Sequence, residues 1–112
     1  MALPVPREGS PQVAARVAAA RLLQADRLAG LGRPELRTNS EADGELLEAA
    51  ALCDEPARGL LRRAAQQLHL SARGYHRVLK VARSIADLDG AETIRKPHLA
   101  EAVSFRRMRP RR

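Results

Sequence analysis

Arg73 stands at a position in a helix where a cation is unfavourable. The segment from Ser71 to Gly90 predicts a complete helix, because Ser71 is a favoured N-cap residue and Asp89-Gly90 is a typical helix end. Arg73 then lies in the first turn, where the helix dipole disfavours positive charge. An anionic ligand is the simplest reason for an arginine there, so the sequence predicts that Arg73 binds an anion.

The same segment divides its side chains between two faces. Six residues recur at helical spacing and are expected to face a core: Tyr75, Val78, Leu79, Ala82, Ile85 and Ala86. The opposite face is expected to carry Arg73, His76, Arg77, Lys80 and Arg83, with Asp87 below them. Most of these charged side chains are interpreted as a solvated helix face, and a surface for nucleic acid is the alternative.

The charge of the chain does not decide between these two interpretations. A net charge of +7 suits a polyanionic partner. However, arginine outnumbers lysine by 18 to 2, as it does in proteins from GC-rich genomes whatever they bind. In addition, no aromatic residues alternate with the basic ones to stack on single-stranded bases.

Length and composition indicate one small helical domain. The chain has 112 residues, and Tyr75 and Phe105 are its only aromatic residues, so aliphatic side chains must form the core. Alanine is abundant and β-branched residues are sparse, which favours helix. The sequence therefore predicts an all-α fold, a small bundle of about five short helices.

Helix caps and breakers divide the chain. Residues 1–9 contain two prolines and a glycine and are expected to form an extended lead-in. Five helices are expected. The first begins near Ser10-Pro11 and runs to Gly30, and the second spans about Glu41 to Leu52. The third follows the N-cap Asp54, the fourth runs from Ser71 to Asp89-Gly90, and the fifth opens at Lys96-Pro97. Residues 30–42 are expected to be a loop, residues 10–106 the helical domain, and residues 107–112 a basic, disordered tail.

Three further helices carry expected inward-facing residues. In the first they are Val13, Val17, Ala20 and Leu28, with Gln24 interrupting the stripe and Arg16, Arg21 and Arg27 on its flanks. In the helix after Asp54 they are Leu60, Leu61, Ala64, Ala65 and Leu68, and in the last helix Leu99, Ala102 and Val103.

Catalytic and metal-binding motifs are absent from the sequence. Cys53 is the only cysteine and lies in an apolar run, which indicates a small buried side chain. The histidines form no ligand-spaced pair, so no metal site is predicted, and there is no glycine-rich phosphate loop or acid–base pair. The chain alone is therefore predicted not to be an enzyme.

The sequence also bears on where the protein is found. Nothing in it is typical of a signal peptide or a membrane span, so we expect a soluble, cytoplasmic protein. The prolines directly after Met1-Ala2 are typical of a domain boundary, and we expect the chain to be one domain of a longer protein.

Two stretches resemble a known family. "LSARGYHRVLKVARSIADLDG" followed by "HLAEAVSFR" resembles the C-terminal helical domain of magnesium-chelatase-like AAA+ ATPases of the ComM type, which is associated with competence. Upstream, "RVAAARLLQADR" resembles another helix of that family, matching at Arg16, Val17, Ala20, Arg21, Gln24 and Arg27, and Asn39 also falls where the family has Asn. The resemblance covers about residues 10 to 106 and departs mildly from the family pattern at Gly74, Ser84 and Phe105.

The resemblance implies a helical lid that accompanies an α/β nucleotide-binding core. Such lids present a "sensor 2" arginine to the γ-phosphate of ATP; the matching residue is Arg73, positioned by the cap Ser71, and Arg77 is a second-rank candidate. ATP and Mg²⁺ are expected to be bound mainly by the core domain, so this chain is not expected to hold ATP tightly. Arg16, Arg21 and Gln24 match the family motif without an assigned role and are interpreted as lid-to-core contacts or surface charge.

The resemblance further implies that the whole protein is an ATPase whose subunits contact their neighbours in a hexameric ring. This ring is expected to act on DNA, as a helicase or branch-migration motor does. The resemblance leaves open whether Arg73 serves its own or a neighbouring subunit, and whether the whole protein is a DNA motor or a metal chelatase. Two alternatives stand beside it. One is a free-standing nucleic-acid-binding module that uses Arg73, Arg77, Lys80 and Arg83, and the other is a protein-docking domain.

Overall fold

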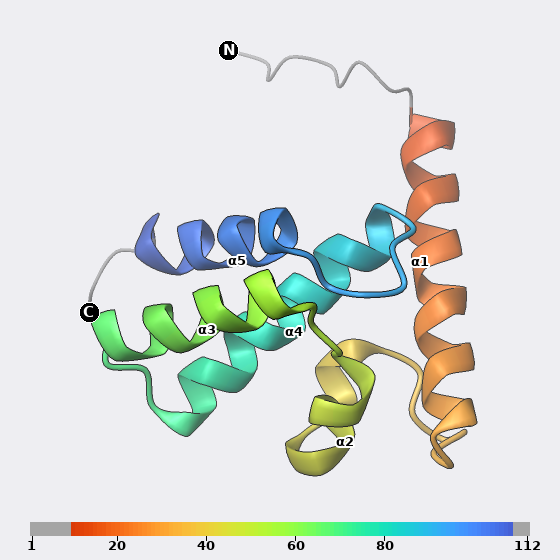
Figure 1. Ribbon diagram of the computed structural model, residues 1–112. Coiled ribbons are helices and arrows are strands. Elements are labelled where there is room, and N and C mark those ends of the chain that lie inside the picture. Colours follow the sequence, from red (N-terminus) through yellow and green to blue (C-terminus); the bar gives the residue numbers. More distant parts are fainter. Residues whose placement is uncertain (1–9, 109–112) are drawn as a thin grey trace.

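The computed structural model describes residues 10–108 and consists of helices joined by short connections (Figure 1). The elements are α1 (Ser10–Gly30), the 3₁₀ helix η1 (Asn39–Glu41), α2 (Gly44–Ala50), α3 (Glu55–Gln67), α4 (Ala72–Leu88) and α5 (Lys96–Met108). The prediction of an all-α bundle is confirmed. The extended lead-in expected for residues 1–9 and the tail expected for residues 109–112 lie outside the described residues.

Three expected boundaries need correction. The second helix begins at Gly44 and ends at Ala50, and it is shorter than expected because the backbone leaves the helical region at Ala51 and forms an isolated parallel bridge between Cys53 and Ile94. The expected loop of residues 30–42 contains η1, and the Glu41 carboxylate accepts hydrogen bonds from the backbone N–H groups of Arg37 and Thr38 just before it. Helix α5 continues to residue 108, two residues into the expected tail.

The predicted caps are confirmed. Asp54 Oδ1 accepts a hydrogen bond from the N–H of Ala57 at 2.9 Å, and Ser71 Oγ accepts one from the N–H of Gly74 at 3.1 Å. Each oxygen satisfies a backbone donor that the first turn of a helix leaves without an intrahelical partner. Helix α4 ends at Leu88 with Asp89 as its C-cap, and the next residue, Gly90, has a φ of 73°, a conformation that favours glycine.

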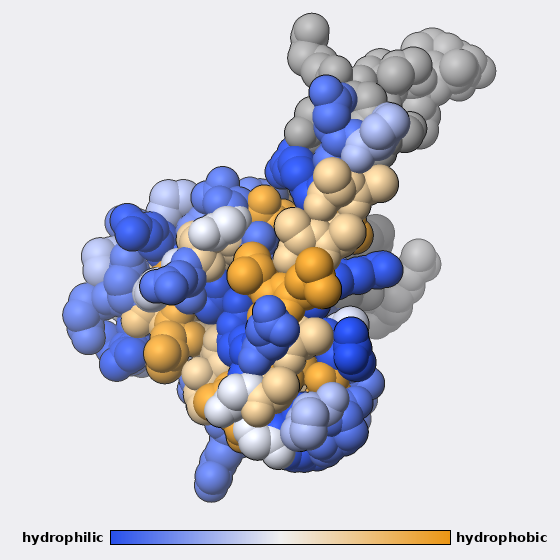
Figure 2. Space-filling model, turned by 90° about the vertical axis from the view of Figure 1, so that its right-hand side faces the viewer, coloured by the Kyte–Doolittle hydropathy of each residue, from blue (hydrophilic) through white to orange (hydrophobic). Residues whose placement is uncertain are grey.

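Helix α1 runs along one side of the molecule, where it packs against α4 (Figure 1). Residues 11–19 are exposed except for Val17, which is half-buried, so the expected inward position of Val13 is wrong. Its buried residues are Ala20, Gln24 and Leu28. Figure 2 looks onto this side and shows uncovered apolar surface among the charged side chains.

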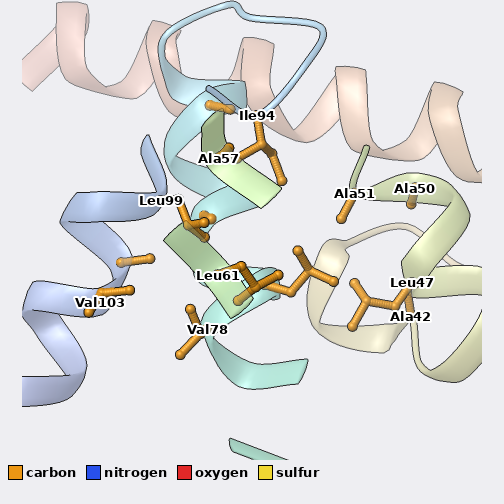
Figure 3. Packing of buried hydrophobic residues seen from close by; sticks show 14 of the residues in the cluster. Ala42, Leu47, Ala50, Ala51, Ala57, Leu61, Val78, Ile94, Leu99 and Val103 are labelled. Carbon is orange, nitrogen blue, oxygen red and sulfur yellow. The ribbon is translucent and has the colours of Figure 1, made fainter. Parts of the chain in front are cut away.

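Helices α3, α4 and α5 form the body of the domain. Helix α5 packs against both α3 and α4, and the buried cluster draws on all three helices, on α2 and on the connections (Figure 3). Its largest members include Leu47, Leu79, Ile94 and Leu99, each fully buried. Burying an aliphatic side chain of this size stabilises the fold by about 1.5–3 kcal/mol, so these contacts hold the body together.

Most of the expected inward positions in the body are confirmed. Buried among them are Leu61, Ala64, Val78, Leu79, Ala82, Ala86, Leu99, Ala102 and Val103. The others are half-buried and border the cluster: Leu60, Ala65, Leu68, Tyr75 and Ile85. None of the helices described between residues 10 and 108 has the length and apolarity needed to cross a membrane.

Candidate functional site

Arg73 lies exposed in the first turn of α4, two residues after the cap Ser71. Within residues 10–108 its guanidinium makes no hydrogen bond and no ion pair, and α4 has no acidic residue in its first turn. Its charge is therefore not neutralised within the described part of the chain, at a helix end whose dipole opposes it. This arrangement leaves the guanidinium able to bind an external anion.

Two further arginines belong to this end of α4. Arg77 is exposed one turn after Arg73, as expected for the second-rank candidate. Arg106 reaches the same end from α5: a methyl group added at Gly74 would lie 3.7 Å from its Nη2 atom. Sequence reasoning did not single out Arg106, because only the packing of α5 across α4 brings it there.

The expected basic face of α4 does not extend along the whole helix. Arg83 and Asp87 are 1% and 2% exposed, so their expected position on the solvated face is wrong. Helix α1 and the connection between α4 and α5 cover this half of α4, which periodicity within one helix cannot reveal. Lys80 is half-buried, donates a hydrogen bond to the backbone carbonyl of Ser40 at 2.9 Å and forms an ion pair with Asp43.

Arg83 is a structural residue in the interior. Its Nη1 and Nη2 atoms donate to the carbonyl oxygens of Glu92 (2.8 Å) and Ala91 (2.7 Å), and Nη2 lies 3.0 Å from Asp87 Oδ1. Burial lowers the pKa of the Arg83 guanidinium from its ordinary value, and the charge of Asp87 opposes that shift. The alternative of a nucleic-acid-binding module was to use Arg73, Arg77, Lys80 and Arg83. Because Arg83 is buried and Lys80 is paired with Asp43, this module loses two of its four proposed contacts.

Gln24 also lies inside the domain rather than at its surface. Its side chain is buried, and its Oε1 atom accepts a hydrogen bond from the backbone N–H of Asn39 at 3.0 Å. This bond ties α1 to η1 and gives a structural role to a motif residue that sequence reasoning left without one. Arg16 and Arg21, by contrast, are exposed on α1.

A cluster of polar side chains joins α1 to α4. It consists of Arg27, Asn39, Ser84 and Asp87, with Arg83 beside it, and we call it the Asp87 cluster. Arg27 donates to both carboxylate oxygens of Asp87, at 3.2 Å to Oδ2, and Asn39 Nδ2 donates to the same Oδ2 at 3.0 Å. Arg27, Ser84 and Asp87 of this cluster stand in the stretches that carry the family resemblance.

Arg16 borders a groove of about 680 Å³ between α1 and the start of α5. Inside it, the backbone N–H of Arg95 donates to His98 Nδ1 at 2.9 Å, and His98 Nε2 lies 3.0 Å from Asp89 Oδ2. Because Nδ1 accepts a hydrogen bond, the ring proton belongs on Nε2, where it donates to Asp89. His98 thus holds the first turn of α5 to the end of α4.

Among residues 10–108, the surroundings of Cys53 do not favour its thiolate, and no group of potential metal ligands forms. Cys53 is half-buried rather than fully buried, and burial raises the pKa of its thiol, which makes it a poor nucleophile. No three His, Cys, Asp or Glu side chains of the described residues come together as metal ligands.

Comparison with known proteins gives matches over nearly the whole chain. A family model described as "Magnesium chelatase, subunit ChlI C-terminal" matches residues 7–106. Competence protein ComM of Haemophilus influenzae is 39% identical over 101 residues, which cover 90% of this chain and 18% of that protein.

Two further similar relatives are described as uncharacterized proteins. YifB of Escherichia coli is 38% identical over 109 residues (91% of this chain, 19% of YifB), and Rv2897c of Mycobacterium tuberculosis is 40% identical over 105 residues (94% and 20%). The chain therefore spans about a fifth of the length of these curated relatives. No solved structure matches it.

Proposed function

Since the chain belongs to the family of the magnesium chelatase ChlI C-terminal domain, we propose that it is the lid of a ComM-type AAA+ ATPase and that Arg73 senses the bound nucleotide. The observation that carries the proposal is the exposed guanidinium of Arg73 in the first turn of α4, with no counter-charge among residues 10–108. An anion brought to this position removes an unfavourable interaction with the helix dipole and adds a charge-assisted hydrogen bond.

The chemistry of the side chain fits a terminal phosphate. A guanidinium stays charged at any physiological pH and presents a planar fork of donors that matches two phosphate oxygens. ATP supplies the transferable phosphoryl group, and the core domain holds its other phosphates and Mg²⁺. Arg73 binds and neutralises the terminal phosphate, and Arg77 is the second candidate on the same surface.

Sensing then follows from the loss of that contact. Without the terminal phosphate Arg73 has no counter-charge, so the favoured orientation of the lid relative to the core differs between nucleotide states. A packed body such as α3–α5 moves as a unit, which suits rigid-body rotation. The phosphate can belong to the nucleotide of the same subunit or of its neighbour in a ring.

For the whole protein we propose a cytoplasmic hexameric ring ATPase that remodels DNA, with branch migration in recombination and competence as its function. The similarity to a relative named competence protein supports this branch of the family over metal insertion into a porphyrin. Its partners are the core domain, the neighbouring subunits and DNA.

The test is Arg73→Ala in the full-length ATPase. We expect kcat to fall at least tenfold, since an arginine on the transferred phosphate contributes this much or more, while nucleotide binding changes little. Arg63→Ala is the matched control, because Arg63 is an exposed arginine on α3. Unchanged turnover in Arg73→Ala removes the proposal.

A further inference from the structure

The direction of α1 is not set by apolar packing. Ala20 and Leu28 are its only fully buried apolar residues in the described structure, whereas Leu22 and Leu23 are 62% and 43% exposed. Contacts between aliphatic side chains are also non-directional, so two such anchors leave the angle of α1 poorly defined. Another interaction must set it.

Arg27 supplies a directional contact. Its two terminal nitrogens donate to the two oxygens of Asp87, in the paired geometry that fixes both distance and angle. The side chain of Asp87 is fully buried and that of Arg27 is 19% exposed, so solvent screens this pair much less than a surface pair. Arg27 is therefore held at one orientation relative to α4.

Asn39 strengthens this geometry from a third element. Besides its bond to Asp87, its Nδ2 atom donates to Ser84 Oγ at 3.0 Å, and its Oδ1 atom accepts from Arg27 Nη1 at 3.4 Å. Its backbone N–H is held by Gln24 of α1. The connection after α1 is thereby fixed to the same turn of α4 as Arg27.

Arg27 can be removed without leaving Asp87 unpaired. Arg83 lies 3.0 Å from Asp87 Oδ1 within the same helix, and Asn39 still donates to Oδ2. Loss of Arg27 therefore removes the paired contact between α1 and α4 and leaves the buried carboxylate with a counter-charge. A substitution of Arg27 can therefore change the orientation of α1 while the body stays folded.

We propose that Arg27 is a positioning residue, which fixes α1 across α4 and thereby fixes the direction in which α4 presents Arg73. Asp87 and Arg73 stand near opposite ends of one continuous helix, with a rise of about 1.5 Å per residue, so a change of angle at one end displaces the other relative to α1. The positioning role rests on the proposed function of Arg73, whereas the effect on α1 does not.

The first arm of the test measures the orientation of α1 directly. Spin labels are placed at Ala18→Cys on α1 and Gln66→Cys on α3 in a Cys53→Ala background, and the distance between them is measured by pulsed electron paramagnetic resonance. We expect a narrow distribution in the parent chain and a broadened or displaced one in Arg27→Gln, with helical circular dichroism retained. An unchanged distribution in folded Arg27→Gln overturns the inference.

Arg33→Gln is the matched control. Arg33 also pairs with a carboxylate, Glu35, at 2.6 Å, but this pair is exposed and joins no two helices. Loss of the Arg33–Glu35 pair should leave the distance distribution between the spin labels narrow. If Arg27→Gln does not fold, Arg27→Lys keeps the charge without the paired geometry, and the same broadening is expected of it.

The second arm measures turnover of the full-length ATPase. A displaced Arg73 should lower kcat about tenfold with little change in ATP affinity, Arg27→Lys should recover part of the loss, and Arg33→Gln should have no effect. If Arg73→Ala leaves turnover unchanged, the proposed function fails and the distance measurement still decides the role of Arg27. If Arg73→Ala slows turnover and Arg27→Gln moves α1 without slowing it, the positioning role fails alone.

Discussion

The body of the domain and its first helix are held in physically different ways. Helices α3, α4 and α5 share a continuous apolar cluster, in which Leu79 and Leu99 are fully buried. Helix α1 contributes Leu28 to that cluster, and its Arg27 and Gln24 form hydrogen bonds to Asp87 and Asn39. The body is stabilised by its buried apolar surface, whereas α1 is oriented by the geometry of these hydrogen bonds.

This difference suits the proposed role of the domain in transmitting movement. An apolar core tolerates small rearrangements but keeps its helices together, because it gains from contact in any orientation. A paired guanidinium and carboxylate is satisfied in one orientation and lost in others. The body can therefore act as one rigid unit, and its orientation relative to α1 depends on a few hydrogen bonds.

The largest effect is expected where the two regions meet. Asp87→Ala removes the partner of both Arg27 and the buried Arg83, so an uncompensated charge remains in the interior. Breaking a buried pair in this way costs about 3–5 kcal/mol. The free energy of unfolding in urea measures it, with exposed Asp26→Ala on α1 as control; a loss equal to that of the control would mean that the cluster does not stabilise the junction.

A smaller loss is expected from the body alone. Leu99→Ala removes a fully buried side chain and leaves a cavity between α5 and its neighbours, which costs about 2–4 kcal/mol. Leu22→Ala on α1, at an exposed position, should cost almost nothing. Equal losses for the two variants in urea denaturation would contradict the division between body and α1.

Gly74→Ala should stabilise the body by about 0.5–1 kcal/mol, because alanine restricts the unfolded chain and favours helix. The added methyl group would meet Ser71 Oγ at 3.4 Å, a side-chain carbon of Leu70 at 3.6 Å and Arg106 Nη2 at 3.7 Å, all ordinary contacts. Thermal unfolding measures the gain. A lower melting temperature would show that the close approach of Arg106 does not tolerate a side chain at this position.

The smallest effect concerns the loop that carries Asn39 towards α1. Hydrogen bonds from the backbone N–H groups of Arg37 and Thr38 lower the pKa of Glu41. The folded state thus gains stability above the unfolded pKa of about 4.3 and loses it as the pH falls through the lower folded pKa. The melting temperature should decline over this acidic range and decline less steeply in Glu41→Gln; equal slopes would exclude this carboxylate as a cause.

The sequence predicted the body better than the junction. Ser71, Asp54 and the periodic positions of α4 and α5 are local signals, and the structure confirms them. The burial of Arg83 and Asp87 was missed because it depends on α1 and on the connection before α5, which lie far away in the sequence.

The candidate site was predicted in part. The exposed position of Arg73 follows from the helix pattern, and the structure agrees with it. The approach of Arg106 depends on the crossing of two helices, which no spacing within either helix predicts. Gln24 was marked by the family motif, but only the fold shows that its oxygen accepts a bond from Asn39.

Native-state hydrogen exchange of the 112-residue chain tests most directly whether α1 is held by the Asp87 cluster and the body by its apolar core. We expect amides of α1 to open at a lower free energy than those of α4 and α5, since α1 buries few apolar groups. In Arg27→Gln protection should fall in α1 while α4 and α5 keep theirs, and Arg33→Gln should match the parent. A uniform loss of protection across all helices in Arg27→Gln would contradict the account.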